Sequence, residues 1–107
     1  MELLEFAKTD TAARLRAAAG RGALPHALIF SGSGDRVAAA RYAAAAMECT
    51  AQHKPCLICP ACRKVVQDIH PDVSFVRDAE HKELSVDTVR AMRADAFIRP
   101  NEGARKV

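Results

Sequence analysis

The feature that most constrains this chain is the position of its four cysteines, which all lie between residues 49 and 62. Cys56, Cys59 and Cys62 follow one another at Cys-x-x-Cys spacing, and Cys49 precedes them in the same stretch. A Cys-x-x-Cys turn directs two thiolates at one point, and its backbone amides favour their negative charge. Four thiolates complete a tetrahedral shell for zinc that leaves no open position for catalysis. The spacing therefore predicts a structural zinc site.

Disulfides, an iron–sulfur cluster and free thiols remain alternative fates for these cysteines. Disulfides would be strained by the short overlapping spacings, and no secretory signal is recognisable in the sequence. An iron–sulfur cluster also uses the Cys-x-x-Cys-x-x-Cys run. The ferredoxin pattern, however, continues with a cysteine and a proline where this chain has Val66 and Gln67. His53 lies inside the loop and is an alternative ligand to one of the thiolates.

The bulk composition is that of one globular domain, residues 1–107, with 50% hydrophobic and 27% charged residues. A net charge of +3 is too small to indicate nucleic-acid binding by itself. Tryptophan is absent and aromatic residues make up 5%, which disfavours a large surface for base stacking. Because no apolar run reaches membrane-spanning length and no signal peptide is recognisable, we expect a cytoplasmic protein without membrane contact.

An apolar run, Ala27–Phe30, predicts a short strand within residues 26–31. Uninterrupted runs of this kind fit a strand that is buried on both faces of a parallel sheet. We expect a helix before it, within residues 1–22, and an alanine-rich helix after it, as far as Met47. A strand, a glycine-containing loop and a helix in this order are the context of a phosphate-binding loop.

The loop between that strand and helix lacks the chemistry of a phosphate-binding site. A working loop ends in Gly-Lys-Ser/Thr, in which the lysine reaches the terminal phosphates and the hydroxyl holds magnesium. Here Gly32 and Gly34 are followed by Asp35 and Arg36. Asp35 places a negative charge where phosphate would lie, although it makes a good helix N-cap. We therefore predict a degenerate loop with no functional ATP site and no ATP hydrolysis.

Downstream of the cysteines, the pattern predicts a helix over residues 60–67, a strand over 73–77 and a final helix capped by Ser85. Residues 78–83 are polar and predict a loop, and residues 105–107 resemble the start of another strand. Two helices are expected to bury one apolar stripe each. The stripes are Val37, Ala40, Ala44 and Met47 in the alanine-rich helix, and Val86, Val89, Met92, Ala96 and Phe97 in the final helix.

Five short motifs occur in the order found in one protein family. They are Leu-Pro-His-Ala-Leu-Ile-Phe-Ser-Gly at 24–32, Pro-Cys-x-x-Cys-x-x-Cys at 55–62, His-Pro-Asp at 70–72, Val-Asp-x-Val-Arg at 86–90 and Glu-Gly-x-x-Lys-Val at 102–107. Over nearly the whole chain, this combination resembles the N-terminal part of bacterial DNA polymerase III clamp-loader subunits. Motor subunits of that family carry an intact Gly-Lys-Thr/Ser loop. The delta-prime subunit typically has a degraded loop, which the one here resembles.

The resemblance implies an α/β fold. The chain would be the N-terminal part of a three-layer AAA+ (P-loop NTPase-like) domain, with a zinc module at about residues 49–70 inserted after the loop's helix. The implied role is a rigid stator in the five-subunit ring that loads the sliding clamp on primed DNA. Other clamp-loader subunits would be direct partners, and the clamp and DNA indirect ones.

Two other functions remain open, an ATP-binding motor subunit of the same clamp loader and a small zinc-binding interaction module. The family's acidic Walker B and arginine-finger motifs do not occur among residues 1–107. The resemblance also implies that the two expected strands are not neighbours in the sheet. We therefore expect them either to pair directly in a rearranged sheet or to be completed by another copy of the chain.

Overall fold

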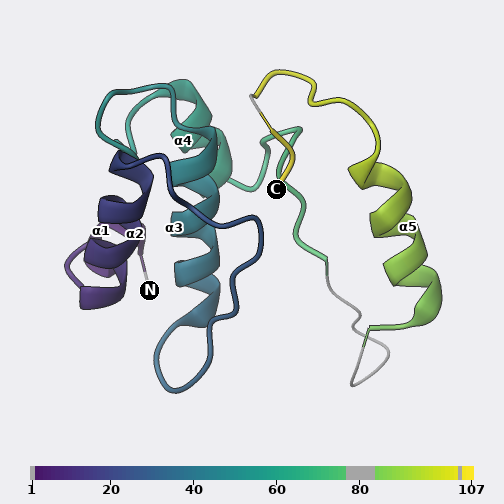
Figure 1. Ribbon diagram of the computed structural model, residues 1–107, viewed down its shortest axis with the longest axis horizontal. Coiled ribbons are helices and arrows are strands. Elements are labelled where there is room, and N and C mark those ends of the chain that lie inside the picture. The colour runs from purple at the N-terminus through teal and green to yellow at the C-terminus, as the bar shows by residue number, and fades with distance from the viewer. Residues whose placement is uncertain (1, 77–83, 104) are drawn as a thin grey trace.

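The computed structural model describes residues 2–76, 84–103 and 105–107, and these ranges contain five helices and no strand (Figure 1). The helices are α1 (Leu3–Phe6), α2 (Asp10–Gly20), α3 (Arg36–Glu48), α4 (Pro60–Val66) and α5 (Val86–Ala96). The central helix is α3, which packs against α1, α2 and α4, whereas α5 stands apart from the other helices (Figure 1). No helix in the described ranges has the length and apolar character needed to cross a membrane.

The predicted α/β three-layer fold is wrong, because the described residues form no sheet. Residues 27–30 adopt no regular structure, and no backbone hydrogen bond joins them to another described segment. Ile29 is 92% exposed. The apolar run favours a buried strand, but burial and strand pairing both depend on neighbours that the described residues do not provide. Direct pairing of residues 27–30 with residues 73–76 is likewise not found in the described ranges.

The second expected strand makes one pair of backbone hydrogen bonds. Val107 N–H donates to the carbonyl oxygen of Asp72 (2.9 Å), and Ser74 N–H donates to that of Val107 (3.0 Å). The two bonds place Val73 beside Val107 in the pattern of a parallel bridge. One bridge is too little for a strand, although it joins the two segments in which strands were expected. Residues 77–83, with the end of that strand and the predicted polar loop, lie outside the described residues.

Helices α1 and α2 pack on α3 through an apolar cluster. Thr9 caps α2, since its Oγ1 accepts from Ala12 N–H at 3.2 Å. The Phe6 and Tyr42 rings meet edge to face with centroids 5.3 Å apart, and Tyr42 is 1% exposed. Arg16 Nη1 donates to the Tyr42 hydroxyl at 2.9 Å, so the buried phenol oxygen has a partner. The cluster comprises Leu3, Phe6, Ala12, Leu15, Ala38, Ala39, Tyr42 and Ala43.

Helix α3 is buried on more than the single stripe that its sequence predicts. Asp35 caps it, with Oδ1 accepting from Ala38 N–H at 2.9 Å. Because other helices cover α3 on two sides, almost every position from Tyr42 to Glu48 is buried, and the small alanine side chains allow this close approach. Val37, which was expected to be buried, is exposed. The predicted stripe was therefore too narrow and partly misplaced.

The final helix, α5, forms where the sequence predicts it but is not buried. Ser85 Oγ accepts from Thr88 N–H at 3.2 Å and caps the helix, as expected. No residue of α5 is buried, and large apolar side chains such as Phe97 are exposed. Lys106 Nζ reaches the side chain and the carbonyl oxygen of Asp95 at 3.2 Å. The expectation that α5 buries an apolar face is therefore wrong within the described residues.

Candidate metal centre

The structure brings the four cysteines to one point between α3 and α4. Their sulfur atoms all lie within 4.8 Å of one another. The Sγ atoms of Cys56 and Cys62 are 4.0 Å apart, and those of Cys49 and Cys59 are 3.9 Å apart. Zinc–thiolate bonds of about 2.3 Å in a tetrahedron place sulfurs about 3.8 Å apart. The four side chains therefore fit a single tetrahedral ion.

Helix termini position three of the four thiols. Cys49 is the C-cap of α3, with its N–H donating to the Ala45 carbonyl oxygen at 2.9 Å. Cys59 is the N-cap of α4, and its sulfur accepts from Cys62 N–H at 3.4 Å. Pro60 follows in the first turn, where its missing N–H has no effect on the helix. Cys62 lies on the buried face of α4, so packing of α4 on α3 brings the ligands together.

Backbone amides converge on the sulfur atoms, as expected for thiolates. Cys49 Sγ accepts from the N–H groups of Ala51 and Cys56, both at 3.4 Å, and Cys56 Sγ accepts from Cys59 N–H at 3.2 Å. Burial opposes ionisation of Cys59, but the N–H groups of Thr50 and Cys62 lower its thiol pKa to about 6. Burial raises the pKa of Cys49 and of Cys62 above the ordinary thiol value. A bound cation would compensate this burial, since it favours the thiolate form.

The geometry also bears on the alternatives for the cysteines. All four thiols are free of disulfides. In an iron–sulfur cluster the cysteines bind different irons, which needs sulfurs farther apart than the separations found here. His53 is exposed and is not part of the converging group, so the arrangement does not use it as a ligand.

A second group of polar side chains, Glu48, His70 and Asp72, is buried beside the cysteines. His70 Nδ1 accepts from Asp72 N–H at 3.1 Å, and His70 Nε2 lies 3.6 Å from Glu48 Oε2. The Nδ1 lone pair is occupied, so a neutral His70 carries its proton on Nε2 and directs it towards Glu48. This tautomer is unsuited to binding a metal through Nε2. We therefore interpret the group as a polar contact rather than a second metal centre.

The carboxylate of Asp72 is held by three consecutive backbone amides. Asp72 Oδ1 accepts from Asn101 N–H, and Oδ2 accepts from Glu102 N–H (2.9 Å) and Gly103 N–H (2.6 Å). Burial alone would raise the pKa of Asp72, but these amides outweigh it and lower the value to about 2. Burial, together with the nearby Asp72 charge, raises the pKa of Glu48 to about 7.

Sequence reasoning missed this second group. The His-Pro-Asp motif at residues 70–72 does not by itself predict a buried contact, and Glu48 belongs to none of the sequence motifs. One signal was available. Glu48 is the only charged residue between Arg41 and Cys49, in an otherwise apolar part of α3. The contact of Asp72 with residues 101–103 had no local signal, because about thirty residues separate the two segments.

The degenerate loop lies at the opposite end of α3 from the cysteines. Gly32 and Gly34 have φ values of +93° and +99°, which other residues rarely adopt. Asp35 places its carboxylate on the first turn of α3, where a phosphate would accept the same hydrogen bonds. A cavity of about 180 Å³ beside the loop is lined by Phe6, Ser33, Arg36 and neighbouring residues. This end of α3 therefore already holds an anion of its own.

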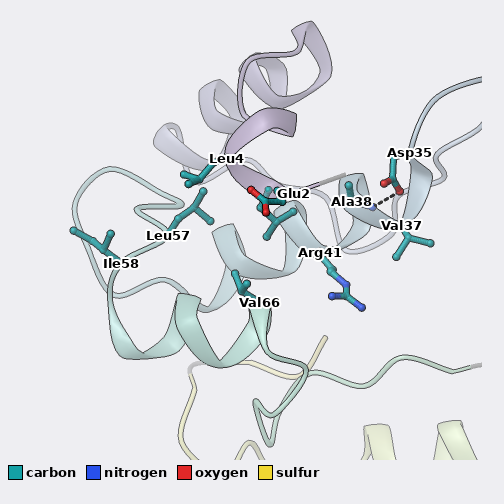
Figure 2. A pocket seen from close by; sticks show the side chains of 10 residues that line it. Glu2, Leu4, Asp35, Val37, Ala38, Arg41, Leu57, Ile58 and Val66 are labelled. Carbon is teal, nitrogen blue, oxygen red and sulfur yellow. Dashed lines mark hydrogen bonds between the residues drawn. The ribbon is translucent and has the colours of Figure 1, made fainter.

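An apolar groove of about 640 Å³ adjoins the metal centre (Figure 2). Leu57 and Ile58, which lie between Cys56 and Cys59, form one side of it together with Leu4 of α1. Val66 of α4 and Arg41 of α3 form the other side. Arg41 is fixed by a 2.7 Å ion pair with Asp68 and lies 5.0 Å from the centre of the Phe75 ring. The sequence predicted no groove, because its walls come from four separate segments.

Comparison with known protein families identifies one match. The model of a family described as "DNA polymerase III, delta subunit" matches residues 7–107. Neither the curated proteins nor the solved structures gave a match.

Proposed function

The chain belongs to the DNA polymerase III delta subunit family, and from this premise we propose that it acts as a delta-prime-like stator in the clamp loader. Membership of the family indicates a delta-type clamp-loader subunit that serves DNA replication. In the proposed role, the chain contacts other clamp-loader subunits directly and the sliding clamp and primed DNA indirectly. It works in the cytoplasm and does not hydrolyse ATP itself.

The observation that carries this proposal is the position of Asp35. Its Oδ1 accepts from Ala38 N–H at the N-terminus of α3, where a nucleotide phosphate would accept that bond. A phosphate there would lose the hydrogen bond and meet a like charge. The two positions directly after Gly34, where a working loop has its lysine and hydroxyl, hold Asp35 and Arg36 instead. The same observation disfavours the ATP-binding motor subunit, the second candidate role within this family.

We further propose that the four cysteines hold one structural zinc ion. The donor set is all thiolate, the sulfurs lie at tetrahedral separations, and the backbone amides directed at them stabilise negative charge. A closed site of this kind supplies folding energy rather than chemistry. Because Cys49 and Cys62 belong to the apolar cluster between α3 and α4, the centre is an integral part of the helical packing. This integration disfavours an independent zinc-binding interaction module.

The role is tested by a titration of the chain with MgATP and by assembly with the other clamp-loader subunits. We expect no saturable binding of MgATP up to about 1 mM. Asp35→Asn is the matched variant, since asparagine keeps the helix cap but removes the charge. We expect this variant to gain weak nucleotide affinity. Submillimolar binding by the unaltered chain, lost in Gly34→Val, would support the motor-subunit role instead.

The assembly arm uses size-exclusion chromatography of the other clamp-loader subunits mixed with this chain. Co-elution of the chain with those subunits is expected for a stator. A chain that elutes alone from every mixture, although it is folded and metal-loaded, would contradict the clamp-loader role. Arg21→Glu, an exposed change at the C-cap of α2, is a control for nonspecific charge effects.

A further inference from the structure

Residues 101–103 and 105–107, here called the returning segment, dock on the chain at Asp72. Three backbone amides of the segment donate to the Asp72 carboxylate, and Val107 exchanges two backbone hydrogen bonds with Asp72 and Ser74. Asp72 is 1% exposed, so its carboxylate depends on these donors for compensation. The position of the returning segment is therefore set by one buried side chain and one backbone bridge.

The surface on which the returning segment docks is made of residues adjacent to the metal ligands. Val73 packs against the apolar cluster that contains Cys49 and Cys62, and the backbone bridge places Val73 beside Val107. From α4, Lys64 pairs with Glu102 of the returning segment, and Lys64 lies two residues from Cys62. Each of these contacts changes if α3 and α4 move relative to each other.

Glu48 provides a third link, through steric contact. It directly precedes Cys49, and its buried carboxylate lies against Gly103. A Cβ atom on Gly103 would be 1.7 Å from Glu48 Oε2. Neither oxygen of Glu48 has a hydrogen-bond partner among the described residues. The returning segment can approach this closely only because residue 103 is glycine and the end of α3 is held in place.

We propose that metal loading of the four cysteines and docking of the returning segment are thermodynamically coupled. The inference rests on the proposed metal centre. Without a cation, the four thiols do not hold the ends of α3 and α4 at one fixed separation, and the surface formed by Glu48, Lys64 and Val73 loses its shape. With the cation bound, that surface is complete and Asp72 receives its three amides. Because coupling is reciprocal, a chain that cannot dock the segment binds the metal more weakly by the same factor.

The first test is hydrogen exchange of the full chain with and without Zn²⁺. We expect zinc to slow exchange of the Ser74, Glu102, Gly103 and Val107 amides at least about 10-fold. Amides in the first half of α2, where Ala12 and Leu15 belong to the cluster with Ala38 and Tyr42, are the internal control and should change little. If Zn²⁺ binds but these four amides exchange as in the metal-free chain, the coupling is wrong while the metal centre stands. If no Zn²⁺ binds, both proposals fail.

The second test uses substitutions read out as Zn²⁺ affinity, measured by competition with a chromophoric chelator. Gly103→Ala should weaken Zn²⁺ binding about 10-fold, because the new methyl group meets Glu48 and displaces the segment. The double variant Glu48→Ala with Gly103→Ala removes the clash and should recover most of the affinity. Rescue of this kind distinguishes coupling from general destabilisation.

A charge variant completes the set. Asp72→Asn is expected to weaken Zn²⁺ binding several-fold, since both carboxylate oxygens accept backbone N–H groups, whereas asparagine keeps one acceptor oxygen and turns the other into an NH2 group that cannot accept. Asp87→Asn, at an exposed position of α5, is the matched control and should leave the affinity unchanged. Equal Zn²⁺ affinities for the unaltered chain, Gly103→Ala and Asp72→Asn would overturn the proposal.

Discussion

Helices α3 and α5 have similar lengths and comparable caps, yet one is the centre of the fold and the other has no buried residue. Helix α3 is rich in alanine and is covered by three other helices. Helix α5 carries larger apolar residues, which remain exposed. The difference shows that an amphipathic pattern specifies a helix, whereas burial requires a partner surface that fits it. The part of the chain around α3 and the cysteines supplies such surfaces, and the part around α5 does not.

The largest expected effect comes from removing a ligand in the α3–α4 region. Cys62→Ser should abolish zinc binding and the local structure that depends on it, because structural zinc sites bind with about 10–16 kcal/mol. The measurement is zinc per chain by atomic absorption, together with far-ultraviolet circular dichroism. Because α5 stands apart from the centre, hydrogen exchange of its amides should stay the same.

His53→Gln is the matched control for that change, since His53 is exposed within the same loop. We expect one zinc per chain in this variant, as in the unaltered protein. A loss of zinc on changing His53, with Cys62→Ser still loaded, would assign the fourth ligand to the histidine.

The second prediction concerns the aromatic contact on the other side of α3. Tyr42→Ala should lower the free energy of unfolding by about 3–5 kcal/mol, because it leaves a cavity beside Phe6. Tyr42→Phe removes only the hydrogen bond from Arg16 and should cost about 1 kcal/mol. Urea unfolding of both variants measures these values. Met92→Ala in α5 should stay within about 0.5 kcal/mol of the unaltered chain, and a larger loss would show that α5 is packed after all.

Part of the fold and of the metal centre could be predicted from the sequence, and part could not. The convergence of the cysteines and the caps at Asp35 and Ser85 depend on residues close together in the chain, and they were predicted correctly. The sheet was predicted wrongly, because the apolar run at residues 27–30 forms a strand only if segments distant in the sequence pair with it. The docking of residues 101–103 on Asp72 is another such contact. No periodic pattern in a sequence indicates a contact between a carboxylate and three backbone amides about thirty residues later.

The third prediction is a pH dependence that arises from Asp72. Its pKa falls from the ordinary 3.8 to about 2 in the folded chain, so folding favours the ionised form. The resulting stabilisation is complete above about pH 4 and is lost as the pH falls towards 2. Asp72→Asn cannot ionise, so the stability difference between the unaltered chain and this variant should shrink over that window. Because Asp72→Asn is also expected to bind Zn²⁺ more weakly, the two proteins lose metal at different pH values, so zinc per chain is measured at each pH and only points with equal zinc content are compared. A difference that stays constant from about pH 5 to 2.5 would contradict the role given to the carboxylate.

We expect the smallest effect on folding from Phe97→Ser, at the C-cap of α5. This substitution is also the most direct test of the exposed apolar side chains there. Phe97 is 86% exposed, so the substitution should change the free energy of unfolding by less than about 0.5 kcal/mol.

The effect of Phe97→Ser should appear in association between copies of the chain instead. Exposed apolar side chains on α5, together with the unpaired residues 27–30, form surfaces that another copy of the chain can cover. We therefore expect concentration-dependent self-association by light scattering, which Phe97→Ser reduces and the exposed polar change Arg90→Ser does not. If the unaltered chain, Phe97→Ser and Arg90→Ser associate equally, the contact between copies is formed by residues 27–30 instead. Ile29→Ser is then the substitution expected to reduce association. A monomer at every concentration would show that these apolar surfaces remain exposed in solution.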